Sequence, residues 1–195
     1  MKITPLTIGL YSPGPGHGKT TVAYALKNRG FEIVSFAEPL RSMAYSLLMD
    51  LGLTPGDAWR ALHEGKNDVI PSLGVSGRYL LRTLGTEWGR DLVHQELWLK
   101  SWIARAGDTP LVVVDDVRFP NEAEMLRKRG AVLWLITSER EGFEQVEANH
   151  RSDGALGGIR FERHVRNDSN LGELVLKVEE ALDALQPERQ VLARC

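Results

Sequence analysis

The sequence predicts an α/β fold in which helices cover a parallel β-sheet. Short apolar segments rich in β-branched residues alternate with helical segments, and a glycine-rich turn joins the first strand to the first helix. Residues 6–11 form a short apolar run that ends at this turn, which is typical of a buried strand. Residues 19–29 favour a helix that Gly30 ends, and residues 32–36 form a second strand. This order is a βαβ unit, and it implies a parallel sheet.

The alternation of strands and helices continues in the second half of the chain. Residues 111–114, Leu-Val-Val-Val, are a mostly β-branched run of the kind that a strand buried on both faces needs. Pro120 opens the next helix, which Gly130 ends. The remaining expected elements are two strands and a final helix with a capping-box pattern, at residues 132–136, 164–167 and 170–185.

Two stretches of the chain have a different character. Residues 39–106 favour helix, with breaks near residues 52–56 and 70–74. In residues 137–163 the periodicity is lost among polar and glycine residues, as in a functional loop or a linker. The helical stretch also predicts a buried apolar stripe on one helical face, formed by Trp88, Leu92, Leu99, Trp102 and Ile103.

The composition fits a globular protein of one domain, or of one domain with inserted segments. The chain has 195 residues, 43% of them apolar and 26% charged, and its net charge is −2. This charge argues against a nucleic-acid polymer as partner, because proteins that bind duplexes are usually basic. The only cysteine, Cys195, allows no internal disulfide, and no apolar run approaches the roughly 20 residues of a membrane span. We expect a cytoplasmic protein with no membrane partner.

A glycine-rich segment from Gly14 to Thr21, Gly-Pro-Gly-His-Gly-Lys-Thr-Thr, lies between the first strand and the first helix, as a Walker A phosphate loop must. Its backbone N–H groups can turn inward around phosphate oxygens, and the start of the helix adds a positive dipole end. The strict motif has glycine where this chain has Pro13, which cannot donate a hydrogen bond. A glycine turn that binds no ligand is the alternative. The residues predicted to bind the donor phosphates are Gly14, Gly16, His17, Gly18, Lys19, Thr20 and Thr21.

Two adjacent carboxylates, Asp115 and Asp116, end the strand at residues 111–114. Enzymes with a phosphate loop need a carboxylate at the end of a neighbouring strand to organise the Mg²⁺ shell, whereas a solvated surface pair is the alternative reading. Because neighbouring side chains on a strand alternate in direction, only one of the two should face the loop, and we favour Asp116. The predicted Mg²⁺ ligands are Thr20, Asp116 and Asp115.

Four short motifs resemble the deoxynucleoside monophosphate kinases encoded by bacteriophages. They are Ala37-Glu-Pro-Leu-Arg41, Leu84-Gly-Thr-Glu-Trp-Gly-Arg90, Asp116-Val-Arg-Phe-Pro-Asn-Glu-Ala-Glu124 and Asn149-His-Arg-Ser-Asp153. The resemblance covers most of the chain. It implies the three-layer α/β fold of the P-loop nucleoside monophosphate kinases, with a five-stranded parallel sheet, a helical acceptor-binding insert and a lid. It also implies ATP as phosphoryl donor, Mg²⁺ as cofactor, a nucleotide as acceptor and a homodimer, in the host cytoplasm if the chain is phage-encoded.

The same resemblance implies one P-loop kinase domain over residues 1–195. Its core would comprise residues 1–37, 107–137 and 164–185, its acceptor-binding helical region residues 38–106, and its lid residues 138–163.

The resemblance also implies functions for individual residues. Arg41 would contact the acceptor phosphate and Arg118 would lie where donor and acceptor meet, although a surface cation is the alternative for any one arginine. Asn167 and Asn170 would contact the adenine of ATP. The implied catalytic residues are Lys19, Arg118, Asp116 and two lid arginines, Arg140 and Arg151. The implied acceptor-binding residues are Glu38, Arg41, Arg82, Glu87, Trp88, Arg90, Arg118, Asn121 and Glu122.

Three hypotheses about function are open at this point. In the first, the 5′-phosphate of a deoxynucleoside monophosphate attacks the γ-phosphorus of ATP, and it needs no general base because it is largely dianionic at pH 7. In the second, the acceptor is the neutral 5′-hydroxyl of a deoxynucleoside, and a carboxylate such as Glu38 is needed as the general base that removes its proton. In the third, the chain is a nucleotide-binding module without catalysis. Arg41 and Arg118 favour the first hypothesis, while base selectivity and the choice between ribose and deoxyribose stay open.

Overall fold

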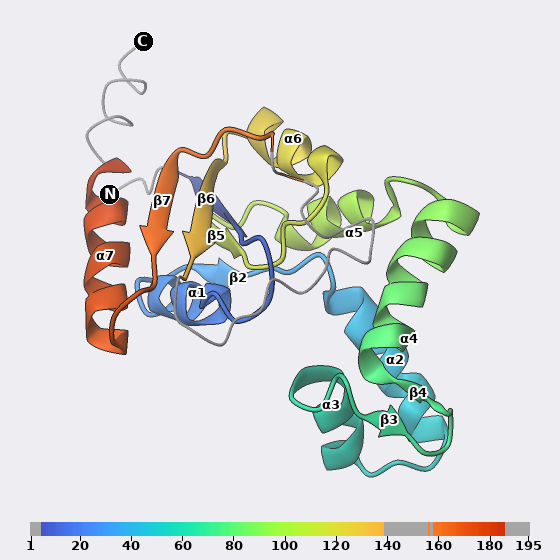
Figure 1. Ribbon diagram of the computed structural model, residues 1–195. Coiled ribbons are helices and arrows are strands. Elements are labelled where there is room, and N and C mark those ends of the chain that lie inside the picture. The colour runs from blue at the N-terminus through green and yellow to red at the C-terminus, as the bar shows by residue number, and fades with distance from the viewer. Residues whose placement is uncertain (1–4, 139–155, 157, 186–195) are drawn as a thin grey trace. The chain divides into compact units, whose positions relative to one another are not determined.

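The computed structural model describes residues 5–138, 156 and 158–185 (Figure 1). The chain forms two compact units, of which the first comprises residues 1–35 and 108–195 and the second residues 36–107. None of the helices in the described ranges combines the length and the apolar character that crossing a membrane requires.

The first unit is built on a five-stranded parallel sheet, as the sequence predicts (Figure 1). The order of the strands across the sheet is β2, β5, β1, β6 and β7. β1 is the central strand, and Ile8 pairs with Val113 of β5 on one side and with Val132 of β6 on the other. The bounds of the strands are β1 Leu6–Tyr11, β2 Glu32–Ile33, β5 Leu111–Val114, β6 Val132–Thr137 and β7 Arg163–Arg166.

Helices cover both faces of this sheet. α1 (Lys19–Lys27) and α7 (Leu171–Asp183) pack on one face, where their apolar residues form one buried cluster with the side chains of alternate strand positions. α6 (Pro120–Lys128) covers the opposite face, since a Cβ on Gly9 of β1 would lie 3.2 Å from Leu126 of this helix. The first unit therefore has three layers, and its inner strands β1, β5 and β6 are largely buried on both sides.

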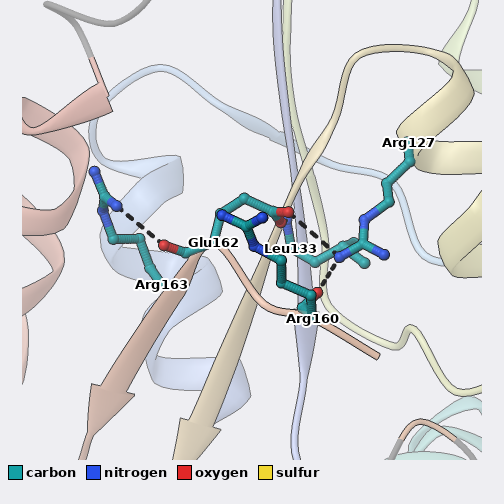
Figure 2. A network of polar contacts seen from close by, with 5 residues as sticks. All are labelled: Arg127, Leu133, Arg160, Glu162 and Arg163. Carbon is teal, nitrogen blue, oxygen red and sulfur yellow. Dashed lines mark hydrogen bonds and ion pairs between the residues drawn. The ribbon is translucent and has the colours of Figure 1, made fainter. Parts of the chain in front are cut away.

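The beginning of β7 is fixed to two other elements by the Glu162 carboxylate (Figure 2). The Leu133 N–H on β6 donates to Oε2 at 2.7 Å, and Nη2 of Arg127 on α6 donates to Oε1 at 3.3 Å. Figure 2 shows the Arg127 guanidinium also donating to the Arg160 carbonyl, and Arg163 donating to the carbonyl of Glu162. These bonds set the position at which the last strand enters the sheet.

The second unit is mainly helical. Its core is a cluster of buried apolar residues from the first two helices and the hairpin, with Leu48 and Leu62 fully buried. Its elements are α2 Glu38–Asp50, α3 Pro55–His63, the antiparallel pair β3 Val69–Ile70 and β4 Val75–Ser76, α4 Gly77–Thr83, the π-helix η1 Leu84–Val93 and α5 Leu97–Ala106.

Three expectations about local structure are corrected. The second strand is confined to Glu32–Ile33, although the Val34 N–H still donates to the Val113 carbonyl at 3.0 Å. The small hairpin of β3 and β4 stands where the sequence predicts only a break between helices. The predicted apolar stripe is confirmed for Leu99 and Trp102, which are buried, but it is wrong for Trp88, Leu92 and Ile103, which are 38%, 79% and 39% exposed. The reason is that residues 88–103 do not form one continuous α-helix. They pass from a π-helix through the extended residue His94 into α5, so that a period of 3.6 residues does not hold across them.

Candidate functional site

The turn between β1 and α1 begins directly after the central strand. Gly16 and Gly18 have φ angles of 83° and 94°, in the left-handed region that L residues rarely adopt. A side chain at Gly18 would also be excluded by its surroundings, because a Cβ there would lie 2.5 Å from Nδ2 of Asn167. These two glycines of the predicted phosphate loop are therefore required by the backbone, whereas Gly14 has no positive φ.

α1 starts at the end of this turn, so the first N–H groups of the helix face the turn. Gly18 is the N-cap residue, and its carbonyl accepts the Val22 N–H at 3.0 Å. Within the described part of the chain, no side chain caps this helix. The first turn of a helix carries N–H groups without partners inside the helix and a partial positive charge. The N-terminus of α1, with the exposed Thr20 and the half-buried Thr21, therefore suits an anion.

The Lys19 ammonium lies beside the beginning of the turn. Nζ of Lys19 donates to the hydroxyl of Ser12, and that hydroxyl donates to the carbonyl of Gly14 at 2.6 Å. Ser12 is buried and follows the last residue of β1. The cation is thus fixed next to the same backbone that would surround a phosphate.

The other side of the turn is held by residues that follow β6 and β7. The Ser138 N–H donates to Nδ1 of His17 at 2.9 Å, and Nδ2 of Asn167 donates to the His17 carbonyl at 3.2 Å. Burial, and next the charge of Lys19, lower the pKa of His17 below its ordinary value of 6.5. The neutral imidazole can accept the Ser138 N–H, because one of its ring nitrogens carries no proton.

The carboxylates after β5 have different surroundings. Asp115 is half-buried, and its Oδ1 accepts the Ser35 hydroxyl at 2.6 Å. Asp116 is buried, with 8% of its surface exposed. Because β5 pairs with β1 in parallel, both carboxylates lie at the carboxyl ends of the strands, where the phosphate loop also begins. Hydroxyl and carboxylate oxygens are the ligands that Mg²⁺ prefers, and it usually keeps several waters, so Thr20 with this pair fits the ion. Among the described residues, no group of three or more histidine, cysteine or acidic side chains could hold a metal alone.

Glu122 has a structural contact that the sequence does not suggest. Its carboxylate is 2% exposed, and Oε2 accepts the backbone N–H of Arg118 at 2.7 Å and of Phe119 at 3.0 Å. It therefore fixes the turn before α6, while the Arg118 side chain is exposed and Asn121 is half-buried. The arginine expected at the reaction centre is placed by its backbone, not by an ion pair that the structure describes.

In the second unit, the first turn of α2 lies against the π-helix. A Cβ on Gly85 would lie 3.3 Å from Cδ1 of Leu40, so the two motifs that the sequence places at residues 37–41 and 84–90 meet here. Nη1 of Arg41 lies 3.5 Å from Oε2 of Glu38. The structure therefore places Glu38 and Arg41, two predicted acceptor-binding residues, on the helix turn that contacts the backbone of the second motif at Gly85.

The π-helix carries three further predicted residues. Glu87 and Trp88 are exposed, whereas Arg90 is 8% exposed and its Nη1 lies 3.4 Å from the Gln95 carbonyl. A π-helix is rare and is frequent at functional sites. Its two glycines, Gly85 and Gly89, allow close packing against Trp98. Trp98 donates from Nε1 to the Gly85 carbonyl at 2.7 Å, and a Cβ on Gly89 would lie 2.4 Å from the same indole.

The remaining predicted residues are distributed more widely. The Arg82 guanidinium lies over the Tyr79 ring, 5.4 Å from its centroid, and is exposed. Asn170 is the N-cap of α7 and its side chain accepts the Glu173 N–H at 3.0 Å, which confirms the predicted start of this helix. Arg140 and Arg151 lie outside the described residues.

Three serines with hydrogen bonds at the site were missed from the sequence. Ser12 follows β1, Ser138 follows β6, and Ser35 lies shortly after β2. Their positions were a usable signal, because ligands of open α/β sheets bind outside the carboxyl ends of the strands.

Two solved structures that resemble this chain are distant likenesses. A protein of Thermus thermophilus is 20% identical with a TM-score of 0.49, covering 95% of this chain and 98% of its own. Dephospho-CoA kinase from Campylobacter jejuni is 11% identical with a TM-score of 0.47, covering 91% of this chain and 96% of its own. Likenesses of this degree carry no conclusion about function.

Comparison of sequences gives two viral relatives, and no family model matches the chain. Over an alignment of 103 positions the chain is 46% identical to deoxynucleoside-5′-monophosphate kinase of Escherichia phage T5, and this alignment covers 49% of this chain but only 40% of the phage protein. A protein of Acanthamoeba polyphaga mimivirus with the provisional name deoxynucleotide monophosphate kinase is 27% identical over an alignment of 202 positions, gaps included, and this alignment covers 90% of this chain and 95% of the viral protein. The chain is thus similar in sequence to viral proteins named as deoxynucleoside or deoxynucleotide monophosphate kinases, the resemblance that its motifs predict.

Proposed function

We propose that the protein is a P-loop kinase that transfers the γ-phosphoryl group of ATP to the 5′-phosphate of a deoxynucleoside monophosphate. The observation that carries the proposal is the turn at residues 14–18, which leads into the N-terminus of α1, where no described side chain caps the helix and the Lys19 ammonium lies nearby. The names of the two viral relatives support the class of acceptor.

The donor phosphates would lie against the loop amides and the first turn of α1. Lys19 would exchange its hydrogen bond with Ser12 for the β- and γ-phosphate oxygens, where its charge offsets the charge that develops during transfer. Mg²⁺ would neutralise the β- and γ-phosphates further. The Thr20 hydroxyl and the carboxylates of Asp116 and Asp115 are the residues that would hold the ion, the carboxylates through water.

The transfer itself is an in-line displacement. An oxygen of the acceptor phosphate forms a bond to the γ-phosphorus while the bond to the β–γ bridging oxygen breaks, and ADP leaves with that electron pair. A phosphate monoester has a second pKa near 6, so the acceptor is largely dianionic at pH 7 and gives up no proton in the step. Catalysis then depends on positioning and on cations, and we assign these functions to Lys19, Arg118 and Arg41.

We assign the acceptor base to the exposed face of the π-helix. Glu87 and Trp88 are exposed there, so they are free to meet a ligand, whereas the largely buried Arg90 has a backbone partner. Arg82, Asn121 and Glu122 complete the proposed acceptor set, with Glu122 acting through the turn that it fixes.

A second candidate function keeps Glu38 as a general base for a deoxynucleoside. The specific observation in its favour is that the Glu38 carboxylate is exposed at the start of α2. The same carboxylate lies 3.5 Å from the Arg41 guanidinium, and this ion pair equally suits a pocket for a phosphorylated acceptor.

The deciding experiment is an acceptor screen. Purified protein with ATP and Mg²⁺ is given each of the four deoxynucleosides, the four deoxynucleoside monophosphates and the four ribonucleoside monophosphates, and ADP release is measured against a reaction without acceptor. We expect release with one or more deoxynucleoside monophosphates. Turnover of unphosphorylated nucleosides alone would favour the Glu38 mechanism, and ATP binding without any acceptor-dependent release would favour a binding module.

We also propose a lid at residues 138–163, within a single kinase domain, and a homodimer in the cytoplasm, or in the host cytoplasm for a phage-encoded chain. Arg140 and Arg151 would neutralise the transferring phosphoryl group from this lid. Sedimentation equilibrium tests the dimer, because a monomer mass at micromolar concentration would contradict it. Arg151→Ala tests the lid arginine, which should lower kcat more than it raises the KM for ATP.

A further inference from the structure

The phosphate loop is connected to the ends of two strands by a continuous set of hydrogen bonds. The Asn167 N–H donates to the Thr137 carbonyl at 2.7 Å, and the Ser138 hydroxyl donates to the Asn167 carbonyl at 2.8 Å. From this fixed backbone, the Asn167 side chain donates to the His17 carbonyl at 3.2 Å, while the Ser138 N–H donates to the His17 ring at 2.9 Å. Two neighbouring strand ends thus hold one residue of the loop at two points.

The bond from Asn167 fixes the direction of one peptide group. In a trans peptide the carbonyl oxygen and the next N–H point to opposite sides. Because the His17 carbonyl points to Asn167, the Gly18 N–H points away from it. The contact is close, since a Cβ on Gly18 would lie 2.5 Å from the Asn167 amide nitrogen. The side chain at residue 167 therefore controls which way an amide of the loop faces.

We propose that Asn167 is a positioning residue for the phosphate loop, which holds the Gly18 amide toward a bound polyphosphate. This rests on the proposed function only in requiring that the loop bind a polyphosphate. It differs from the contact with adenine that the family resemblance implies, because Asn167 acts here through the peptide between His17 and Gly18.

The departure of the loop from the strict motif gives this bond more weight. Pro13 has no N–H, so the outer edge of the loop offers one donor fewer than a glycine at that position would. The remaining amides must then be well aligned, because donors that are already oriented bind charge without a cost of reorganisation. Asn167 can align one of them because its own backbone is fixed by Thr137 and Ser138.

The test compares Asn167→Ala with the wild-type protein, using inorganic tripolyphosphate and ATP as probes in titration calorimetry. Both dissociation constants should rise about tenfold, the effect of one well-aligned hydrogen bond. In steady-state assays the KM for ATP should rise by a similar factor, while the KM for the deoxynucleoside monophosphate stays within about twofold. A merely structural loss would change both KM values or neither.

Lys177→Met is the matched control. Nζ of Lys177 donates to the Arg166 carbonyl at 2.8 Å, so this variant loses a hydrogen bond at the same end of β7 without touching the loop, and it should bind tripolyphosphate as the wild type does. If Asn167→Ala does not fold, Ser138→Ala takes its place. It removes the hydroxyl that holds the Asn167 carbonyl, and it should weaken tripolyphosphate binding about threefold.

The outcomes separate this inference from the proposed activity. Equal binding of tripolyphosphate by Asn167→Ala, or by Ser138→Ala if that variant is used, and the wild type overturns the positioning function and leaves the kinase proposal standing. Weakened binding by the variant, together with a wild-type protein that phosphorylates no acceptor, supports the positioning function and ends the kinase proposal. A wild-type protein that binds no tripolyphosphate overturns both.

Discussion

The ammonium of Lys19 and the hydroxyl of Ser12 are hydrogen-bonded to each other across the phosphate loop. The same hydroxyl donates to the Gly14 carbonyl at 2.6 Å, so the cation is attached to the loop backbone through one side chain. Ser12 precedes Pro13, at the point where the loop departs from the strict motif. A polyphosphate that binds in the loop must compete with this bond, and the relationship therefore makes Lys19 the first residue to test.

Lys19→Ala should lower kcat/KM for ATP by about a hundredfold or more, because a preorganised donor to a developing charge is typically worth that much. The free energy of unfolding should change by less than about 1 kcal/mol, since one partly exposed hydrogen bond is lost. Coupled assays and urea denaturation measure the two quantities. Lys27→Ala, at the end of the same helix, is the control and should keep full activity. Full activity in Lys19→Ala would refute the assigned function.

The two carboxylates after β5 should differ in their effect on the requirement for Mg²⁺. Asp116→Asn should raise the Mg²⁺ concentration at half-maximal rate about tenfold, because it removes the charge that organises the ion's water shell. Asp115→Asn should raise it less, since neighbouring side chains of a strand alternate in direction and Asp116 is the one that we assign to the side of the loop. Rates measured over a Mg²⁺ series at saturating ATP give the comparison. A larger shift for Asp115→Asn would exchange the two assignments.

The parallel sheet was predictable because its signals are local. The β-branched run at residues 111–114 predicts a strand, and the glycine turn before Lys19 predicts the start of a helix, each from a few residues of sequence. The structure confirms both, along with the cap at Asn170. In the candidate site, Gly16 and Gly18 were predicted for the same reason. Their positive φ angles favour glycine, and this preference is visible in the local sequence.

The rest of the site depends on contacts between residues that are distant in sequence. The bonds of His17 to Ser138 and to Asn167 span 121 and 150 positions, and no local pattern predicts them. The π-helix was not predicted, for a different reason. Periodicity arguments assume 3.6 residues per turn, and Leu92 was therefore placed on a buried face although it is exposed.

Glu122 should contribute to stability more than to binding. Glu122→Ala leaves the N–H groups of Arg118 and Phe119 without their buried acceptor, which should lower the free energy of unfolding by about 1.5–3 kcal/mol. Glu122→Gln should cost less, because its amide oxygen can still accept one or both bonds. Urea denaturation at constant m-value gives both numbers. Equal stability of Glu122→Ala and the wild type would show that solvent replaces the carboxylate.

The pH dependence of stability should report His17. Its folded pKa lies below 6.5 because of burial and the Lys19 charge, so the unfolded chain takes up the proton at a higher pH than the folded chain does. The stability contributed by the neutral imidazole is therefore complete above pH 6.5 and is lost as the pH falls from 6.5 through the folded pKa. His17→Asn keeps an acceptor near the position of Nδ1 but does not titrate. Its free energy of unfolding should fall less than that of the wild type between pH 7 and about pH 5.

A direct measurement separates the two causes of the shift. Titration of the His17 ring by NMR should give a pKa below 6.5 in the wild type. In Lys19→Met the pKa should rise toward its ordinary value without reaching it, because burial remains and is the larger cause. A wild-type pKa above 6.5 would mean that the fold favours the protonated ring, and it would contradict a neutral ring that accepts the Ser138 N–H, because a protonated imidazole has no acceptor to offer.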